Sequence, residues 1–242
     1  MDYNPVANNT QYCLSIRFFP DGFSLFVSGE DKKTVVSRHV NAVLAELSTD
    51  DILDLLSGQE ELNMNFGTVR IIVESDFYST APAGIFRVGD ETALLRFVYP
   101  DLPGNMSVVE NELLPWNAFL IYALPANLNE ALQTTLPELV PEHHLSAFMA
   151  DNVPLSADTA FYAFFRSGVV DFMVFDAGRP LLVNSLQCKT AEDLLYYLLK
   201  ISGLHNIDTY RVSLKLYNAD RKTDYQSVLE KYFSICEINH KQ

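Results

Sequence analysis

Acidic side chains stand at the ends of two strand-like segments, where their carboxylates could bind a divalent cation. Asp21 follows the apolar segment 12–19, and Glu74 and Asp76 close the segment 68–76. If the second segment runs parallel to the first, the three carboxylates meet at one edge of a sheet, and carboxylate oxygens are ligands that suit Mg²⁺. Asp is also common in turns for conformational reasons alone. The alternative interpretation is therefore a turn residue and two solvated strand ends.

A second set of polar residues takes similar places later in the chain. Ser167 and Gly168 suit a two-residue turn between strand-like segments, and Asp220 follows the segment 210–218. This pattern brings Asp220 near Ser167. Cradling a phosphate needs several converging backbone N–H groups, which usually means several glycines. Turns this tight are not expected to do so.

Histidine and cysteine residues give no recognisable metal site. His143 and His144 are adjacent in a segment expected to be extended, near 144–149, so their side chains should point to opposite faces and not grip one ion. The three cysteines, Cys13, Cys188 and Cys236, are far apart in the sequence. Buried reduced thiols are the expected outcome. Lys189 beside Cys188 is the one basic neighbour that would lower a thiol pKa.

Common catalytic motifs are missing from the sequence. It has no G-x-S-x-G, no Walker-type loop, no H-E-x-x-H and no Rossmann glycine fingerprint. Ser, His and Asp occur without a local context that marks a triad. An enzymatic activity is therefore not favoured.

Composition and charge exclude several classes of protein. Of 242 residues, 48% are hydrophobic, and 31 acidic against 17 basic side chains give a net charge of −14. The scattered bases do not form the basic patch of a nucleic-acid binder, and an acidic surface repels anionic lipid. The first residues lack a secretory signal, and the longest uncharged run is broken by Pro115 and Pro125. We expect no membrane insertion and a cytoplasmic location.

The second half of the chain predicts an ordered series of elements. Thr190 is a good helix N-cap, and Gly203 is a plausible stop for the helix that it begins. The expected order is β-β-β-α-β-α-β, with strands at 161–165, 169–175, 181–186, 210–218 and 234–238, a helix after Thr190 and a second helix at 222–233. The three early strands form an antiparallel meander, and the helix returns the fourth strand parallel to the first.

The first half repeats this series. Asp21-Gly22 predicts a type I′ hairpin turn, and Ser48 begins a helix as Thr190 does, with Asp51 aligned on Asp193. Further strands are expected at 12–19, 23–29, 33–40 and 68–76, with a helix at 48–56 that meets Gly58. The sequence thus predicts one folding unit used twice, over 1–150 and 151–242.

Extra material separates the two copies. The segment from Phe77 to Ala150 begins with a Pro/Gly stretch, "STAPAGIF", and then predicts helices at 90–97 and 127–136 and strands near 106–113 and 118–124. Trp116 and most other aromatic side chains are expected in the core. Of Tyr196 and Tyr197, one is expected to be exposed.

The two meanders, "CLSIRFFPDGFSLFVSG" and "FYAFFRSGVVDFMVFDAGRPLLVNSL", and the segment "FYSTAPAGIF" carry a resemblance to a known architecture. Two β-β-β-α-β-α-β units in one chain resemble the duplicated ribonuclease H-like fold of the actin-like ATPase superfamily. More closely, the chain looks like an uncharacterised family of bacteroidete proteins, a domain of unknown function with that fold. The resemblance implies an α/β protein of two ribonuclease H-like subdomains side by side, with mixed sheets and helices on their faces.

The superfamily implies ATP bound between the two halves by D-x-G hairpins. In this chain the equivalent turns are "FPDGFSLF" and "FRSGVVDF", which lack that spacing and the further glycines. The resemblance would place six residues at the edge of the cleft: Asp21, Gly22, Asp76, Ser167, Gly168 and Asp220. Two hypotheses follow. The first is a non-catalytic protein that needs no cofactor and acts through contacts with a protein partner. The alternative is a divergent ATPase or kinase-like protein that binds ATP and Mg²⁺ in the cleft.

Overall fold

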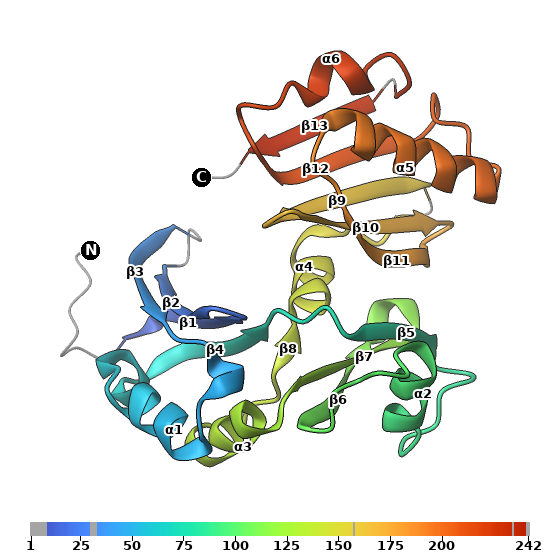
Figure 1. Cartoon of the computed structure of the whole chain (residues 1–242). Helices are drawn as coiled ribbons and strands as arrows, with labels where there is room; N and C mark the ends of the chain where they lie inside the picture. The colour runs from blue at the N-terminus through green and yellow to red at the C-terminus, as the bar shows by residue number, and fades with distance from the viewer. Residues whose placement is uncertain (1–8, 30–32, 157, 234, 241–242) are drawn as a thin grey trace. The chain divides into compact units, whose positions relative to one another are not determined.

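The computed structural model describes residues 9–29, 33–156, 158–233 and 235–240 (Figure 1). The chain divides into two compact units, Met1–Val153 (unit 1) and Pro154–Gln242 (unit 2). Each unit contains a five-stranded mixed sheet, and unit 1 also carries a three-stranded sheet.

The main sheet of unit 1 has the strand order β3-β2-β1-β4-β8. Its strands are β1 (Asn9–Phe19), β2 (Gly22–Ser28), β3 (Thr34–Asn41), β4 (Phe66–Val73) and β8 (Glu142–His143). The first three form the expected antiparallel meander, and β4 pairs parallel with both β1 and β8. The prediction that the fourth strand returns parallel to the first is confirmed.

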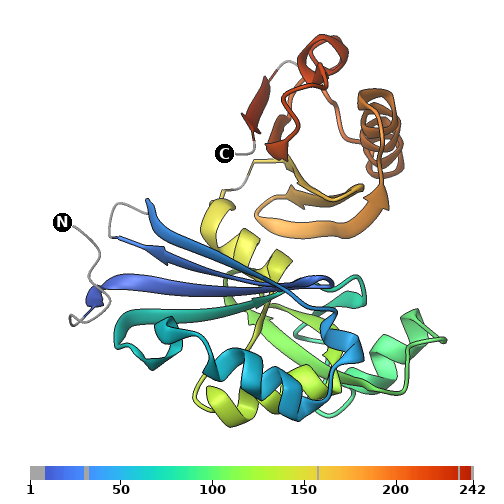
Figure 2. The ribbon, with the colours of Figure 1, turned by 60° about the vertical axis from the view of Figure 1, so that its left-hand side comes forward.

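Helices cover both faces of this sheet. Leu14, Ile16 and Phe18 of β1 are fully buried on one face, where α1 (Thr49–Ser57) and α3 (Ala126–Thr135) lie side by side (Figures 1 and 2). The helix α4 (His144–Asn152) lies on the opposite face, because its Asp151 contacts Arg70, which is paired with Ser15 on that face. Short 3-10 turns, η1 (Leu44–Glu46), η2 (Glu60–Asn63) and η3 (Leu114–Trp116), complete the connections.

An insert between β4 and β8 forms a small body with its own core. Its sheet has the order β5-β7-β6, from β5 (Tyr78–Pro82), β7 (Ala118–Pro125) and β6 (Met106–Leu113), and α2 (Glu91–Val98) packs on it. Phe86, Leu95 and Ile121 belong to its buried cluster. The Pro/Gly stretch, for which no strand was predicted, overlaps β5. The strand is short, lies at the sheet edge and ends at Pro82, where a missing N–H is tolerated.

The expectation of an extended segment near 144–149 is wrong, because these residues form α4. All six residues from His144 to Met149 are buried. A helix that is buried all round shows no apolar stripe, so periodicity cannot separate it from a buried strand. The His143 side chain caps the helix by accepting the Leu145 N–H at 3.3 Å.

Unit 2 is the simpler copy. Its sheet has the order β11-β10-β9-β12-β13, and one buried cluster joins its strands to α5 and α6. The elements are β9 (Ala160–Arg166), β10 (Val169–Asp176), β11 (Arg179–Gln187), α5 (Ala191–His205), β12 (Ser213–Ala219), α6 (Tyr225–Leu229) and β13 (Ile235–His240). A helix was predicted over 222–233, but the observed helix α6 covers only Tyr225–Leu229. Gly203 does not end α5, because Asn206 takes the left-handed position there, with φ 55°.

The duplication is visible in both topology and local contacts. Each five-stranded sheet runs third, second, first, fourth, fifth, the order that two ribonuclease H-like units share. Ser48 with Asp51 and Thr190 with Asp193 form reciprocal capping boxes at equivalent helices. Within the described residues, no helix is long and apolar enough to cross a membrane.

Candidate functional site

The first predicted turn differs from its expected form. Phe19 pairs with Gly22, so the turn residues are Pro20 and Asp21. The Pro20 ring fixes φ near −65°, whereas a type I′ turn needs positive φ at that position. Gly22 lies inside the sheet with φ 150°, and a Cβ there would sit 2.0 Å from the Val40 carbonyl oxygen. This glycine serves a close backbone approach.

The acids after β4 lie at the same end of the sheet. The Glu74 N–H donates to the Phe18 carbonyl at 2.9 Å, and the Asp76 carbonyl accepts the Tyr99 hydroxyl at 3.2 Å. Asp76 is already in the bend that leads to β5, so the chain is leaving the sheet. Among the residues that the structure describes, no three His, Cys, Asp or Glu side chains are grouped to hold a metal.

In unit 2 the predicted residues gather at the equivalent strand ends. Arg166 pairs with Val169, so Ser167 and Gly168 are the whole turn, and Gly168 has φ 75°. The Asn218 side chain donates to the Phe165 carbonyl at 3.0 Å, which ties the end of β12 to the end of β9. The Asp220 carboxylate accepts the Lys222 N–H at 3.1 Å and the Thr223 hydroxyl at 3.3 Å. It stabilises its own loop.

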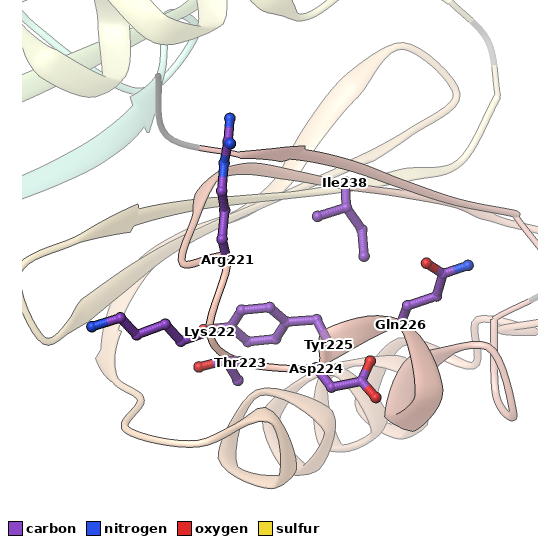
Figure 3. Close-up of a pocket in the computed structure, with 7 residues that line it drawn as sticks. All are labelled: Arg221, Lys222, Thr223, Asp224, Tyr225, Gln226 and Ile238. Atoms are coloured by element: carbon purple, nitrogen blue, oxygen red, sulfur yellow. The ribbon is translucent and has the colours of Figure 1, made fainter.

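This loop lines a small polar pocket, drawn in Figure 3. The pocket has a volume of about 250 Å³ and is lined by Arg221, Lys222, Thr223, Asp224, Tyr225, Gln226 and Ile238. It lies next to the carboxyl end of β12, between the loop that follows this strand and Ile238 of β13.

A larger hollow of about 510 Å³ lies at the other end of the same sheet. Its carboxylates have local partners. Asp158 accepts the Ser156 hydroxyl at 2.8 Å, Asp176 accepts the Thr159 hydroxyl at 2.5 Å, and Asp208 pairs with Arg211 at 3.4 Å. Because these are the amino ends of the parallel strands, we favour the smaller pocket as the site.

A buried ion pair lies directly behind the second turn. Arg166 makes two hydrogen bonds to Asp171, at 2.7 and 3.0 Å, and the Ser185 hydroxyl donates to the same carboxylate at 2.5 Å. Their side chains are 6% and 0% exposed for Arg166 and Asp171. Arg166 and Asp171 lie on neighbouring strands, and the sequence analysis did not predict that they would pair. The signal that could have revealed it is Asp171 in the middle of an otherwise apolar strand.

The equivalent place in unit 1 holds a different polar set. Ser24 and His39 face each other across β2 and β3, as Asp171 and Ser185 do across β10 and β11. The Ser24 Oγ lies 2.8 Å from His39 Nδ1, and His39 Nε2 lies 3.0 Å from Asn41 Oδ1. An Nε2–H donated to Asn41 leaves Nδ1 to accept the Ser24 hydroxyl. Ser24 is 6% exposed, whereas His39 lies at the surface.

The histidine pair does not have the predicted geometry. Because β8 ends at His143 and α4 begins at His144, the two rings are neighbours, with centroids 4.2 Å apart. His143 is fully buried, and its Nε2 lies 3.0 Å from the Ser75 carbonyl. Tyr122 donates to the Pro141 carbonyl at 2.7 Å, and burial raises the pKa of its hydroxyl. These contacts join the insert to the main sheet.

Arg70 anchors β8 and α4 to the main sheet of unit 1, on the face that α4 covers. It donates two hydrogen bonds to Glu142, at 2.8 and 2.7 Å, and two to Asp151, at 3.1 and 2.9 Å. The Glu142 contact is the main reason that the pKa of Arg70 is raised. Nearby, burial raises the pKa of Cys13. The arrangement satisfies its own charges and serves structure.

The cysteines are free and half-buried, whereas buried thiols were expected. Burial raises the pKa of Cys188 to about 11 and that of Cys236 to about 11. Lys189 is the one basic neighbour of Cys188 in the sequence, but burial and the Asp193 carboxylate set the direction of the Cys188 pKa shift. Trp116 is buried, as expected, and Tyr196 is the exposed member of its pair, at 58%.

Comparison with known proteins places the chain in a family. Residues 2–236 match the family described as Protein of unknown function (DUF3822), so the chain belongs to that family. No curated protein sequence matches it.

Solved structures share the fold. A Bacteroides thetaiotaomicron VPI-5482 protein with an actin-like ATPase fold and unknown function is 23% identical, with a TM-score of 0.77 over 95% of this chain and 91% of that one. The PilM-PilN type IV pilus biogenesis complex is 14% identical, with a TM-score of 0.52 over 93% and 87%. A Streptococcus pneumoniae TIGR4 ROK family protein in complex with sucrose is 10% identical, with a TM-score of 0.50 over 94% and 92%. The chain thus has the actin-like ATPase fold that its sequence resembles.

Proposed function

We propose that this DUF3822 protein is a non-catalytic member of the actin-like fold that acts by binding another protein. The observation that carries the proposal is the shape of the two hairpins that would have to hold phosphate. Each turns through only two residues, Pro20-Asp21 and Ser167-Gly168. An anion needs several converging N–H groups, and turns of two residues offer few.

The backbone beside the first turn is committed to the sheet. Gly22 pairs with Phe19 on one side and with Asn41 on the other. The Ala42 N–H donates to the Asp21 carbonyl at 3.0 Å. The glycine that resembles a phosphate-loop residue is therefore used to bring β2 and β3 together.

Exposed apolar side chains on the insert support a role in protein contacts. Ile85, Val88 and Phe97 are 79%, 81% and 87% exposed. Contiguous apolar surface often marks an interaction site, and these three residues lie close together in the sequence. One neighbour of the same fold, PilM, is known in complex with a protein, PilN. The proposal places this chain in the cytoplasm with a comparable dependence on a protein partner.

A thermal-shift series with ATP, ADP and Mg²⁺ tests the absence of nucleotide binding. A ligand at a hundred times its Kd adds about 2.7 kcal/mol of stability, which for a chain of this size raises Tm by roughly 5–10 °C. We expect no shift at millimolar nucleotide. A shift that is lost in Asp21→Ala would overturn the proposal in favour of ATP binding that uses Asp21.

A purification experiment tests the partner role. The wild-type protein and the variant Phe97→Asp are used as bait in extracts of the native cell, with exposed Arg87→Glu as the matched control. We expect one protein to be retained by the wild type and the control and lost by Phe97→Asp, while all three baits give the same circular dichroism spectrum. Identical retention by all three baits would remove the insert from the proposal.

A further inference from the structure

We propose that the pocket between the β12–α6 loop and β13 binds an acidic segment of the protein partner. The inference rests on the proposed function, since it specifies the chemistry of that partner. Arg221 and Lys222 lie side by side in the loop and line the pocket. Across the described parts of the chain, neither side chain forms an ion pair.

The acids of the same loop are already used. Asp220 holds the Lys222 N–H and the Thr223 hydroxyl. Asp224 also lines the pocket, but its carboxylate caps α6 by accepting the Ser227 N–H at 3.1 Å, and that hydrogen bond lowers its pKa. The two cations of the loop are thus left to face an external anion.

The size of the pocket selects a side chain over a whole nucleotide. Sites that enclose a small-molecule ligand usually measure about 300–1,000 Å³, whereas this pocket has about 250 Å³. It can accept one or two side-chain groups. Tyr225 and Ile238 supply apolar surface on which the methylene stem of a Glu can rest.

The directions of the two cations favour a segment with several acids over a single phosphate. Figure 3 shows the Arg221 and Lys222 side chains leaving the loop in different directions, with the Tyr225 ring between the loop and Ile238. One oxyanion held by both would require the two heads to converge. Two carboxylates spaced along an extended peptide meet both heads as they stand, and each would form a charge-assisted hydrogen bond.

The electrostatic background also distinguishes this surface. Unit 2 contains 10 acidic and 10 basic side chains, so its net charge is zero. Unit 1 contains 21 acidic and 7 basic side chains and therefore carries the whole charge of −14. An acidic segment meets no net repulsion from the unit that holds the pocket.

The test is fluorescence anisotropy of a labelled ten-residue Glu/Asp peptide with the full chain at about 20 mM and 300 mM salt, since exposed charge pairs are screened at high salt. We expect binding at low salt that weakens roughly tenfold in Arg221→Glu/Lys222→Glu, the loss of about two exposed ion pairs. The control Arg179→Glu/Lys231→Glu changes the same charge at exposed positions of unit 2 and should bind like the wild type.

Four other results would overturn the inference. Equal weakening in both variants means that the peptide senses net charge alone. Displacement of the peptide by millimolar inorganic phosphate means that the site is a phosphate site. Self-association at low salt that disappears in Arg221→Glu/Lys222→Glu means that a second copy of this chain is the occupant. No peptide binding, with no nucleotide shift, rejects this inference and leaves the non-catalytic role intact.

Discussion

The same strand end carries acids alone in unit 1 and both acids and bases in unit 2. Counting from Val73 and Tyr217, the last residues that pair with the first strand, Asp76 in unit 1 corresponds to Asp220 in unit 2. Glu74 stands near Asp76, whereas Arg221 and Lys222 follow Asp220. The duplicated scaffold has kept its strand order, its helix caps and an acid at this end, while unit 2 has two basic residues in addition. The two copies are therefore expected to meet different partners.

The sheet centres differ in a related way. At one pair of equivalent positions, unit 1 uses the neutral contact between Ser24 and His39, and unit 2 uses a charged contact between Asp171 and Ser185, completed by Arg166. A neutral hydrogen bond contributes about 1 kcal/mol. A broken buried ion pair costs about 3–5 kcal/mol, because one charge is left uncompensated. The two units should therefore respond very differently to truncation at this place.

The largest expected effect comes from Asp171→Ala. It should lower the free energy of unfolding by about 3–5 kcal/mol, against about 1 kcal/mol for Ser24→Ala, both measured by urea denaturation followed by circular dichroism. Arg166→Met/Asp171→Leu should recover most of the loss, because an apolar pair leaves no buried charge. Equal losses for the two single variants would contradict the distinction between the units.

The hairpins give the next largest contrast. Gly22→Ala brings a Cβ within 2.0 Å of the Val40 carbonyl oxygen at φ 150°, whereas Gly168→Ala meets no atom within 4 Å at φ 75°. We expect a loss of roughly 2–4 kcal/mol for Gly22→Ala, from strain and overpacking. The loss for Gly168→Ala should be about 1–2 kcal/mol, from backbone strain alone. Trp116 is the single tryptophan and lies in unit 1, so its fluorescence should report the first change.

Local chemistry explains what the sequence could predict. The meanders, the parallel return strand and the caps at Ser48 and Thr190 depend on alternation and on short-range contacts, and the structure confirms them. β5 and α4 were missed because one is a short edge strand and the other is buried all round. Neither leaves a periodic signal in the sequence.

The candidate site was harder to predict than the fold. The strand ends that hold Asp21, Asp76 and Asp220 follow from topology, whereas a shared site for these residues stays a prediction. The pocket next to Asp220 depends on how the β12–α6 loop folds over β13, and this loop includes residues 222–224, which were predicted to be helical. The Arg166–Asp171 pair depends on cross-strand register, which is fixed by the turn.

The helix caps should behave alike in the two units, and the expected losses of stability are smaller than those above. Ser48→Ala and Thr190→Ala each remove a side chain that accepts the N–H of the third helical residue, Asp51 or Asp193. Each loss should be about 1 kcal/mol, measured by urea denaturation at pH 7. Losses that differ by more than twofold would mean that one cap is supported by its surroundings, and the repeat would then be less exact than its geometry suggests.

The smallest effect is the pH dependence of the same caps. Hydrogen bonds from Ser48 lower the pKa of Asp51, and the backbone N–H groups of Lys189 and Thr190 contribute to lowering that of Asp193. A carboxylate with a depressed folded pKa stabilises the protein above its unfolded value, near 4, and this stabilisation is lost as pH falls through the folded pKa. Asp51→Asn and Asp193→Asn should therefore be less stable than the wild type at pH 7, and the gap should close on acidification below about pH 4. If the difference in stability between the wild type and a variant persists at pH 2, the carboxylate in that unit acts through its geometry and not through its charge.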